Sequence, residues 1–97
     1  MNLKVSRTLL HEDQIAIELK KLDGWSRAGN EMQSTRQFQD FPQAIKFVNS
    51  VALIAEQFDH HPDIDIRWNK VVLTLSTHSA GGLTPLDFTV AKAIEQI

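Results

Sequence analysis

The chain has 97 residues, of which 42% are hydrophobic and 23% are charged, as is usual for one globular domain. Its formal net charge of −2, with no cluster of basic residues, makes a nucleic-acid-binding surface unexpected. The absence of cysteine excludes disulfides, thiolate metal sites and a cysteine nucleophile. The longest apolar run, Val51–Ala55, is far shorter than a membrane span, and Met1–Leu10 lacks the pattern of a signal peptide. We therefore expect one domain over residues 1–97, located in the cytoplasm and not in a membrane.

The first predicted elements are a helix and a hairpin. Apolar residues spaced by four and three positions predict a helix over His11–Leu22, which Gly24 would end as a left-handed C-cap. A short strand over Trp25–Ala28, a turn at Gly29-Asn30 and a second strand over Met32–Phe38 follow. The second strand is only half apolar, which is typical of a strand with one solvated face.

A long central helix is predicted from Asp40 to about Phe58, because an Asp N-cap is followed by Pro in the first turn and Gln at the third position. Its apolar residues fill an arc of roughly 180°, whereas a surface helix usually needs about 100°. The residues of this arc are Phe41, Ala44, Ile45, Phe47, Val48, Val51, Ala52, Ile54, Ala55 and Phe58. We expect the surplus side, Phe47–Val51–Ile54, to meet another subunit or to fill a groove between helices of the same chain.

The second half of the chain predicts another hairpin and a last helix. Ile64–Trp68 alternates as a strand with one buried side, Asn69-Lys70 forms a turn, and Val71–Thr77 is a β-branched strand. After the glycine-containing loop Ser79–Leu83, the pattern Thr84-Pro85-Leu86-Asp87 begins a helix that runs to Ile97. The inward face of that helix would be one of two sets of residues. The first set is Phe88, Ala91 and Ile94, and the second is Ala93 and Ile97. The order α-β-β-α-β-β-α predicts an α+β fold, a four-stranded antiparallel sheet with helices on one face.

Three of the four histidines, His60, His61 and His78, fall within nineteen residues and are the candidate functional groups. Imidazole exchanges protons near neutral pH, so such a cluster indicates general acid–base chemistry. His61 precedes Pro62, which favours an extended backbone, and neighbouring side chains in an extended segment point in opposite directions. The fourth histidine, His11, is expected to be an ordinary surface residue.

Other interpretations of these residues stay open. The histidine pair after the long helix could complement the negative helix end, or one imidazole could be purely structural. A metal site is disfavoured, because the nearest carboxylates Glu56, Asp59 and Asp63 follow no recognised ligand spacing. Glu56, one helical turn before His60, could orient that imidazole or simply be solvated.

Three further residues have a structural explanation, and one of them has a second possible role. Asp87 has a sufficient role in capping the last helix. The tryptophans Trp25 and Trp68 are expected to anchor the core, although Trp68, at a strand end, could instead stack on a flat heterocycle.

The spacing of these residues resembles that of the pterin-4a-carbinolamine dehydratase family. Glu56 is followed at fixed intervals by His60-His61-Pro62, Trp68, His78 and Asp87, and the resemblance extends from about Leu9 to Ile97. The segments that carry it include Asp23-Gly24-Trp25, Phe58–Pro62, Asn69-Lys70-Val71, Leu75–His78 and Gly81–Thr84. The chain departs from the family at Ile64, where an aromatic residue is frequent, and at Ser79, where an acid is frequent.

The resemblance implies a hydro-lyase that removes water from a 4a-hydroxytetrahydropterin, giving the quinonoid dihydropterin without a metal or organic cofactor. It implies that His60 and His78 are the acid–base pair and that His61 mainly binds and polarises the pterin. Asp59–His61 and Ser76–Ser79 would form the two walls of the pocket, including Thr77, with Trp25 or Trp68 near its rim. Glu56, Pro62 and Asp87 would support this catalytic set.

The resemblance also implies a homodimer or homotetramer, with the long helix and the sheet edge at subunit contacts. It further implies tetrahydrobiopterin recycling for an aromatic amino-acid hydroxylase as pathway partner. Relatives of this fold serve as a dimerisation cofactor or an enzyme-assembly factor, so a non-catalytic binding module is the alternative.

Overall fold

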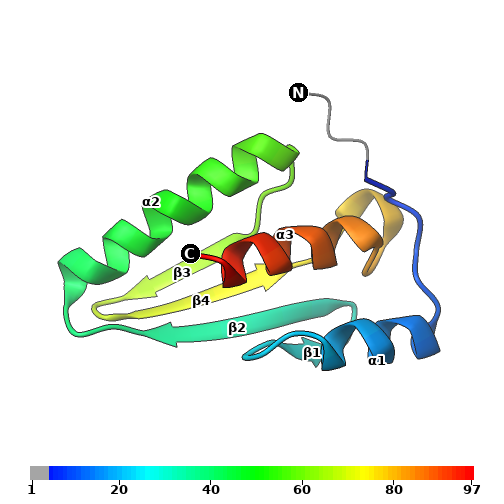
Figure 1. Ribbon diagram of the computed structural model, residues 1–97, viewed down its shortest axis with the longest axis horizontal. Helices are drawn as coiled ribbons and strands as arrows, with labels where there is room; N and C mark the ends of the chain where they lie inside the picture. The colour runs from blue at the N-terminus through cyan, green and yellow to red at the C-terminus, as the bar shows by residue number, and fades with distance from the viewer. Residues whose placement is uncertain (1–4) are drawn as a thin grey trace.

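A computed structural model describes residues 5–97 of the chain, so the expectation for Met1–Leu10 lies partly outside the described residues. The predicted element order is confirmed (Figure 1). In chain order the elements are α1 (Glu12–Lys20), β1 (Ser26–Ala28), β2 (Glu31–Gln37), α2 (Phe41–Phe58), β3 (Asp63–Arg67), β4 (Lys70–Leu75), the short 3₁₀ helix η1 (His78–Ala80) and α3 (Pro85–Glu95).

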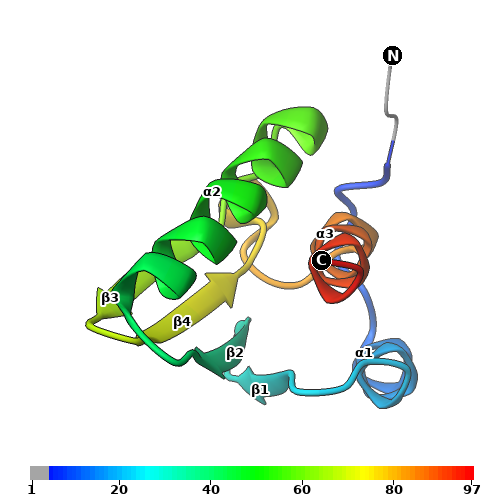
Figure 2. The same ribbon diagram turned by 60° about the vertical axis from the view of Figure 1, so that its left-hand side comes forward.

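The sheet has the strand order β1-β2-β4-β3, and every neighbouring pair is antiparallel. Figure 2 shows the helices on one side of this sheet, which leaves its other face open. Side chains on the covered face, such as Met32, Leu73 and Leu75, are fully buried. They pack with Phe88 and Ile94 of α3, so the first of the two predicted inward sets of that helix is the observed one.

The predicted starts of α2 and α3 are confirmed by hydrogen bonds. The Asp40 carboxylate accepts from the backbone N–H of Gln43 at 3.0 Å, and Asp87 accepts from the N–H of Thr84 at 2.9 Å. Each cap satisfies a backbone donor that the first helical turn leaves unpaired. These two caps fix where each helix begins.

Several local boundaries differ from the prediction by one or two residues, and two of these differences change how an element ends. α1 ends at Lys20 with Lys21 as its right-handed C-cap, so Gly24 does not cap it. Gly24, with φ of +80°, instead lies in the turn that leads to β1. β4 ends at Leu75 rather than Thr77, because Thr77 pairs with Gly82 and the chain then closes into η1.

Of the two expectations for the surplus apolar side of α2, the groove between helices of the same chain is the one observed. Val51 is fully buried, and Phe47 and Ile54 pack against the same core, so this side fills the space beside α3 within the chain. The large apolar residues of α2 that are exposed are Phe41, at 47%, and Leu53, at 74%. The wide arc is explained by contact of α2 with both β4 and α3.

β3 is also more exposed than its alternating pattern predicts. All five of its residues are exposed, and Ile64 and Ile66 each keep 37% of their surface accessible. The reason is topological, since β3 is an edge strand that pairs only with β4. Within residues 5–97, no helix is long and apolar enough to cross a membrane.

Candidate active site

Seven of the predicted residues surround one cavity of about 310 Å³, which we call the histidine pocket. One wall comes from the turn after α2 and the other from the segment after β4, and Arg7 completes the lining. The lining residues are Arg7, Asp59, His60, His61, Ser76, Thr77, His78 and Ser79. A cavity of this volume is within the range of small-molecule sites.

A left-handed residue at the end of α2 separates the two neighbouring histidines. Asp59 has φ of 50° and ψ of 46°, and its N–H closes the helix onto the carbonyls of Ala55 and Glu56. After this turn His60 is 7% exposed, whereas the His61 side chain is 55% exposed. The two imidazoles therefore occupy different environments, as an extended segment predicts.

His60 is held by a buried carboxylate. Its Nε2 lies 2.6 Å from Oδ1 of Asp87, which has no exposed surface. An ionised carboxylate only accepts hydrogen bonds, so Nε2 of His60 carries the hydrogen. The other ring nitrogen, Nδ1, has no partner among residues 5–97, and none of their buried side-chain polar atoms is unpaired, so Nδ1 must reach solvent.

Asp87 is itself fixed by two threonines. Its Oδ2 accepts from the Thr77 hydroxyl at 2.8 Å and from the Thr84 backbone N–H at 2.9 Å. Because the Thr77 hydrogen goes to Asp87, the Thr84 hydroxyl is the donor in the 2.8 Å contact between the two threonines. The helix cap predicted for Asp87 is therefore confirmed, and the same carboxylate also orients His60.

Of the two roles left open for Glu56, orienting His60 is not observed. Glu56 Oε2 lies 2.5 Å from Nε2 of His61 instead, and both side chains are largely exposed. Residue spacing along α2 could not show which histidine Glu56 contacts, because the left-handed backbone at Asp59 changes the chain direction and turns His60 inward.

His78 opens η1 and reaches the histidine pocket from the opposite wall. Its side chain is exposed, and its ring makes no hydrogen bond to residues 5–97. Arg7, which sequence reasoning missed, donates from Nη2 to the Asp59 carbonyl at 3.1 Å. No local pattern marks Arg7, because its role depends on a contact across 52 positions.

The structure does not bring the two tryptophans to the histidine pocket of a single chain. Trp25 is 8% exposed and donates from its indole nitrogen to Glu95 at 2.9 Å, in the core. Trp68 lies in the turn between β3 and β4, at the far end of that hairpin, and at 67% exposure it does not anchor the core as expected. Pro62, which directly follows His61, is buried.

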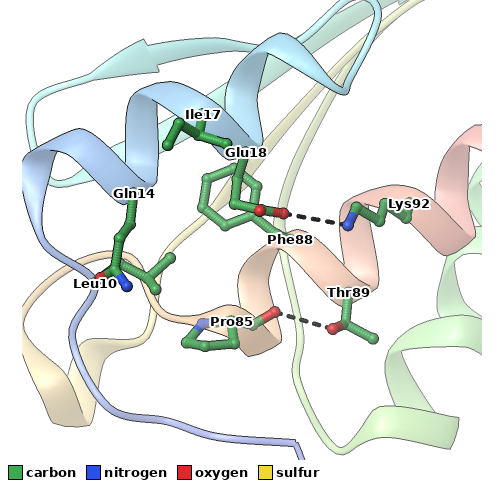
Figure 3. Close-up of a pocket in the computed structure, with 8 residues that line it drawn as sticks. All are labelled: Leu10, Gln14, Ile17, Glu18, Pro85, Phe88, Thr89 and Lys92. Carbon is green, nitrogen blue, oxygen red and sulfur yellow. Dashed lines mark hydrogen bonds and ion pairs between the residues drawn. The ribbon is translucent and has the colours of Figure 1, made fainter.

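A second cavity, of about 340 Å³, lies between α1 and α3 (Figure 3). An ion pair between Glu18 and Lys92 crosses it, and Phe88 forms part of its lining. It contains no histidine, and none of the predicted site residues lines it. The histidine pocket is therefore the candidate active site.

The fold and the pocket define a small α+β domain that places imidazole groups at one end of an antiparallel sheet. Residues 8–97 match the family described as Pterin 4 alpha carbinolamine dehydratase. The chain belongs to this family, whose named activity is that of a hydro-lyase.

Individual relatives agree with this assignment. A protein of Roseiflexus castenholzii is 55% identical over 92% of this chain and 96% of its own length. A protein of Sulfurisphaera tokodaii is 47% identical over 91% of this chain and 95% of its own length. Both are provisionally named pterin-4-alpha-carbinolamine dehydratases. A crystal structure from Brucella melitensis, titled transcriptional coactivator/pterin dehydratase, superposes with a TM-score of 0.86 at 36% identity, covering 90% of this chain and 95% of that one.

Proposed function

We propose that the chain removes water from a 4a-hydroxytetrahydropterin to give the quinonoid dihydropterin. Membership of the family and the composition of the histidine pocket support this assignment. The observation that carries it is the His60 imidazole, held by a buried Asp87 in a cavity that His78 also lines.

The proposed chemistry needs two proton transfers and no redox step. One imidazole delivers a proton to the hydroxyl on C4a, so that the C–O bond breaks and water leaves. A second imidazole accepts the proton from a ring nitrogen as the new double bond forms. His60 and His78 are the proposed pair, because they come from opposite walls of the pocket. Each has a ring nitrogen that makes no hydrogen bond to residues 5–97 and can exchange a proton with the substrate.

His61 is proposed to bind and polarise the pterin. Its exposed ring lines the same cavity, and Glu56 restricts its orientation. The flat pterin would also take hydrogen bonds from the backbone of the two walls, at Asp59 and between Ser76 and Ser79. In this role His61 contributes more to substrate affinity than to proton transfer.

We propose that a second copy of the chain pairs with the free edge of β3. An unpaired edge with exposed Ile64 and Ile66 favours addition of another strand. In an antiparallel two-fold pairing, one register places Ile66 opposite Ile66 of the partner subunit and Asp65 opposite Arg67 of the partner subunit. This register combines apolar contact at the centre with opposite charges on either side.

The direct test of the activity is to mix the purified protein with freshly generated 4a-hydroxytetrahydropterin and follow the quinonoid product by absorbance. The proposal predicts acceleration over spontaneous dehydration in proportion to protein concentration. The absence of any acceleration would contradict it. A cytoplasmic location and service to an aromatic amino-acid hydroxylase remain predictions of the same proposal.

The second candidate is a non-catalytic binding or assembly module, which the coactivator title of the Brucella structure favours. The two candidates respond differently to loss of the histidines. A partner captured equally well by the wild type and by a variant lacking His60, His61 and His78 would support the binding role. Both roles can reside in one chain.

A further inference from the structure

A second cluster of potential ligands lies beside the histidine pocket. One ligand atom each from Glu31, Asp63 and His78 falls within 4.8 Å of the others. Glu31 begins β2, Asp63 begins β3, and His78 follows the end of β4, which lies between those two strands. The ligand set is therefore assembled by the sheet and is not visible as spacing along the chain.

The strand register explains why these side chains share one face. Asp63 lies opposite Thr74, and Glu31 precedes Met32, which lies opposite Leu75. Since Met32 and Leu75 face the helices, Glu31 and Asp63 both project from the open face of the sheet. The chain segment after β4 brings His78 to the same end of that face.

The charges of the cluster favour a cation. Neither Glu31 nor Asp63 forms an ion pair with a basic side chain among residues 5–97. Two carboxylates at this separation repel each other, and a divalent ion between them would remove that repulsion. The neighbouring His78 ring, which has no hydrogen bond within the same residues, offers a nitrogen ligand.

We propose that Glu31, Asp63 and His78 bind a first-row divalent metal ion such as Zn²⁺ or Co²⁺. One imidazole with two carboxylates suits these ions better than Mg²⁺ or Ca²⁺, which prefer oxygen ligands alone. The spread of the three ligand atoms, within 4.8 Å of one another, is close to that which bonds of about 2.0–2.2 Å to one shared ion need. With three protein ligands the ion keeps an open position and exchanges with solvent.

Metal binding at this cluster would compete with proton transfer, because a metal-bound nitrogen of His78 cannot exchange a proton. This consequence rests on the proposed dehydratase function, whereas the binding itself does not. The ion is therefore proposed as an inhibitor of the histidine pocket, with Glu31 and Asp63 determining its affinity.

The binding test is a titration of the full chain, purified without an affinity tag, with Co²⁺ while its visible d–d absorption is recorded. We expect saturable one-to-one binding that E31Q and D63N each weaken about tenfold or more and that H78A abolishes. D65N is the matched control, since Asp65 lies on the same strand and face two positions further and pairs with Arg67. Equal affinity in the wild type, E31Q and D63N would overturn the proposal, as would loss of binding in H60A but not in E31Q.

The activity arm separates this proposal from the proposed function. Zn²⁺ should inhibit dehydration over the concentration range in which it binds, and E31Q should resist that inhibition. Cobalt binding without any dehydratase activity would refute the enzyme and leave the metal site standing. Activity in a protein that binds no Co²⁺ would refute the metal site alone.

Discussion

Nε2 of His60 lies 2.6 Å from Oδ1 of Asp87, and this hydrogen bond joins the turn after α2 to the first turn of α3. The carboxylate that starts a helix also fixes which nitrogen of a neighbouring imidazole carries hydrogen. Nδ1 is then the nitrogen left for the substrate. Asp87 is thus a positioning residue in the proposed reaction and acts through His60.

Asp87→Asn should lower kcat by about 100-fold, since positioned acid–base groups contribute about 10²–10⁴-fold. An amide can present a donor to Nε2 and reverse the hydrogen-bond pattern of the ring. The pH profile of kcat should also change, which a purely structural loss would not cause. Steady-state rates across the pH range measure both effects.

Asp40→Asn is the control for Asp87→Asn. Asp40 caps α2 in the same way, through the N–H of Gln43, but its side chain makes no contact with a histidine. This variant should keep the wild-type kcat and pH profile. If both variants lost activity equally, the effect would belong to helix capping and not to the His60–Asp87 hydrogen bond.

His61→Ala should raise KM for the pterin substrate more than it lowers kcat. The ring is exposed and paired with an exposed Glu56, so its removal leaves no buried group unsatisfied. Such surface pairs contribute about 0–1 kcal/mol, and the thermal midpoint should hardly change. A large fall in kcat at unchanged KM would instead place His61 in the proton-transfer step.

Ile66→Lys should dissociate the proposed oligomer. A lysine at this position places a charge on the exposed edge of β3 and opposes strand addition. The molar mass by light scattering after size-exclusion chromatography should fall to that of one chain. Ile17→Lys, at a position on α1 that is 55% exposed, is the matched control and should leave the mass unchanged. An Ile66→Lys variant with the wild-type multimeric mass, or a wild type that is already monomeric, would refute the proposed contact.

The pH dependence of stability should include a contribution from Glu12. Two hydrogen bonds from the Arg27 guanidinium, at 2.8 and 2.9 Å, and its positive charge lower the pKa of Glu12 below its usual 4.5. A carboxyl group whose pKa is lower in the folded than in the unfolded chain stabilises the fold at pH values above its unfolded pKa. This stabilisation is lost as the pH falls through the folded pKa. The thermal midpoint of the wild type should exceed that of Glu12→Gln near neutral pH, and the difference should vanish in acid. A difference that persists at low pH would show that Glu12 acts other than by its charge.

The sequence allowed the fold and the helix starts to be predicted because these depend on local signals. Asp40 and Pro42 predict the start of α2, and the same pattern at Thr84 and Pro85 predicts the start of α3. The spacing of hydrophobic residues along the chain likewise predicts the order of helices and strands. These signals do not depend on which residues pack against the helix or strand.

The pairings in the site could not be predicted, because they depend on contacts distant in sequence. Glu56 is near both histidines along the chain, and only the left-handed backbone at Asp59 decides that His61 is its partner. Asp87 reaches His60 across 27 positions. Similarly, Glu31 approaches His78 only through the strand order of the sheet.

The most direct test of the central claim is the dehydration rate of His60→Ala and His78→Ala, each measured against spontaneous loss of water. We expect each substitution to lower the catalysed rate by about 100-fold or more, while the thermal midpoint shows a folded protein. Wild-type rates in both variants would contradict the proposed acid–base pair.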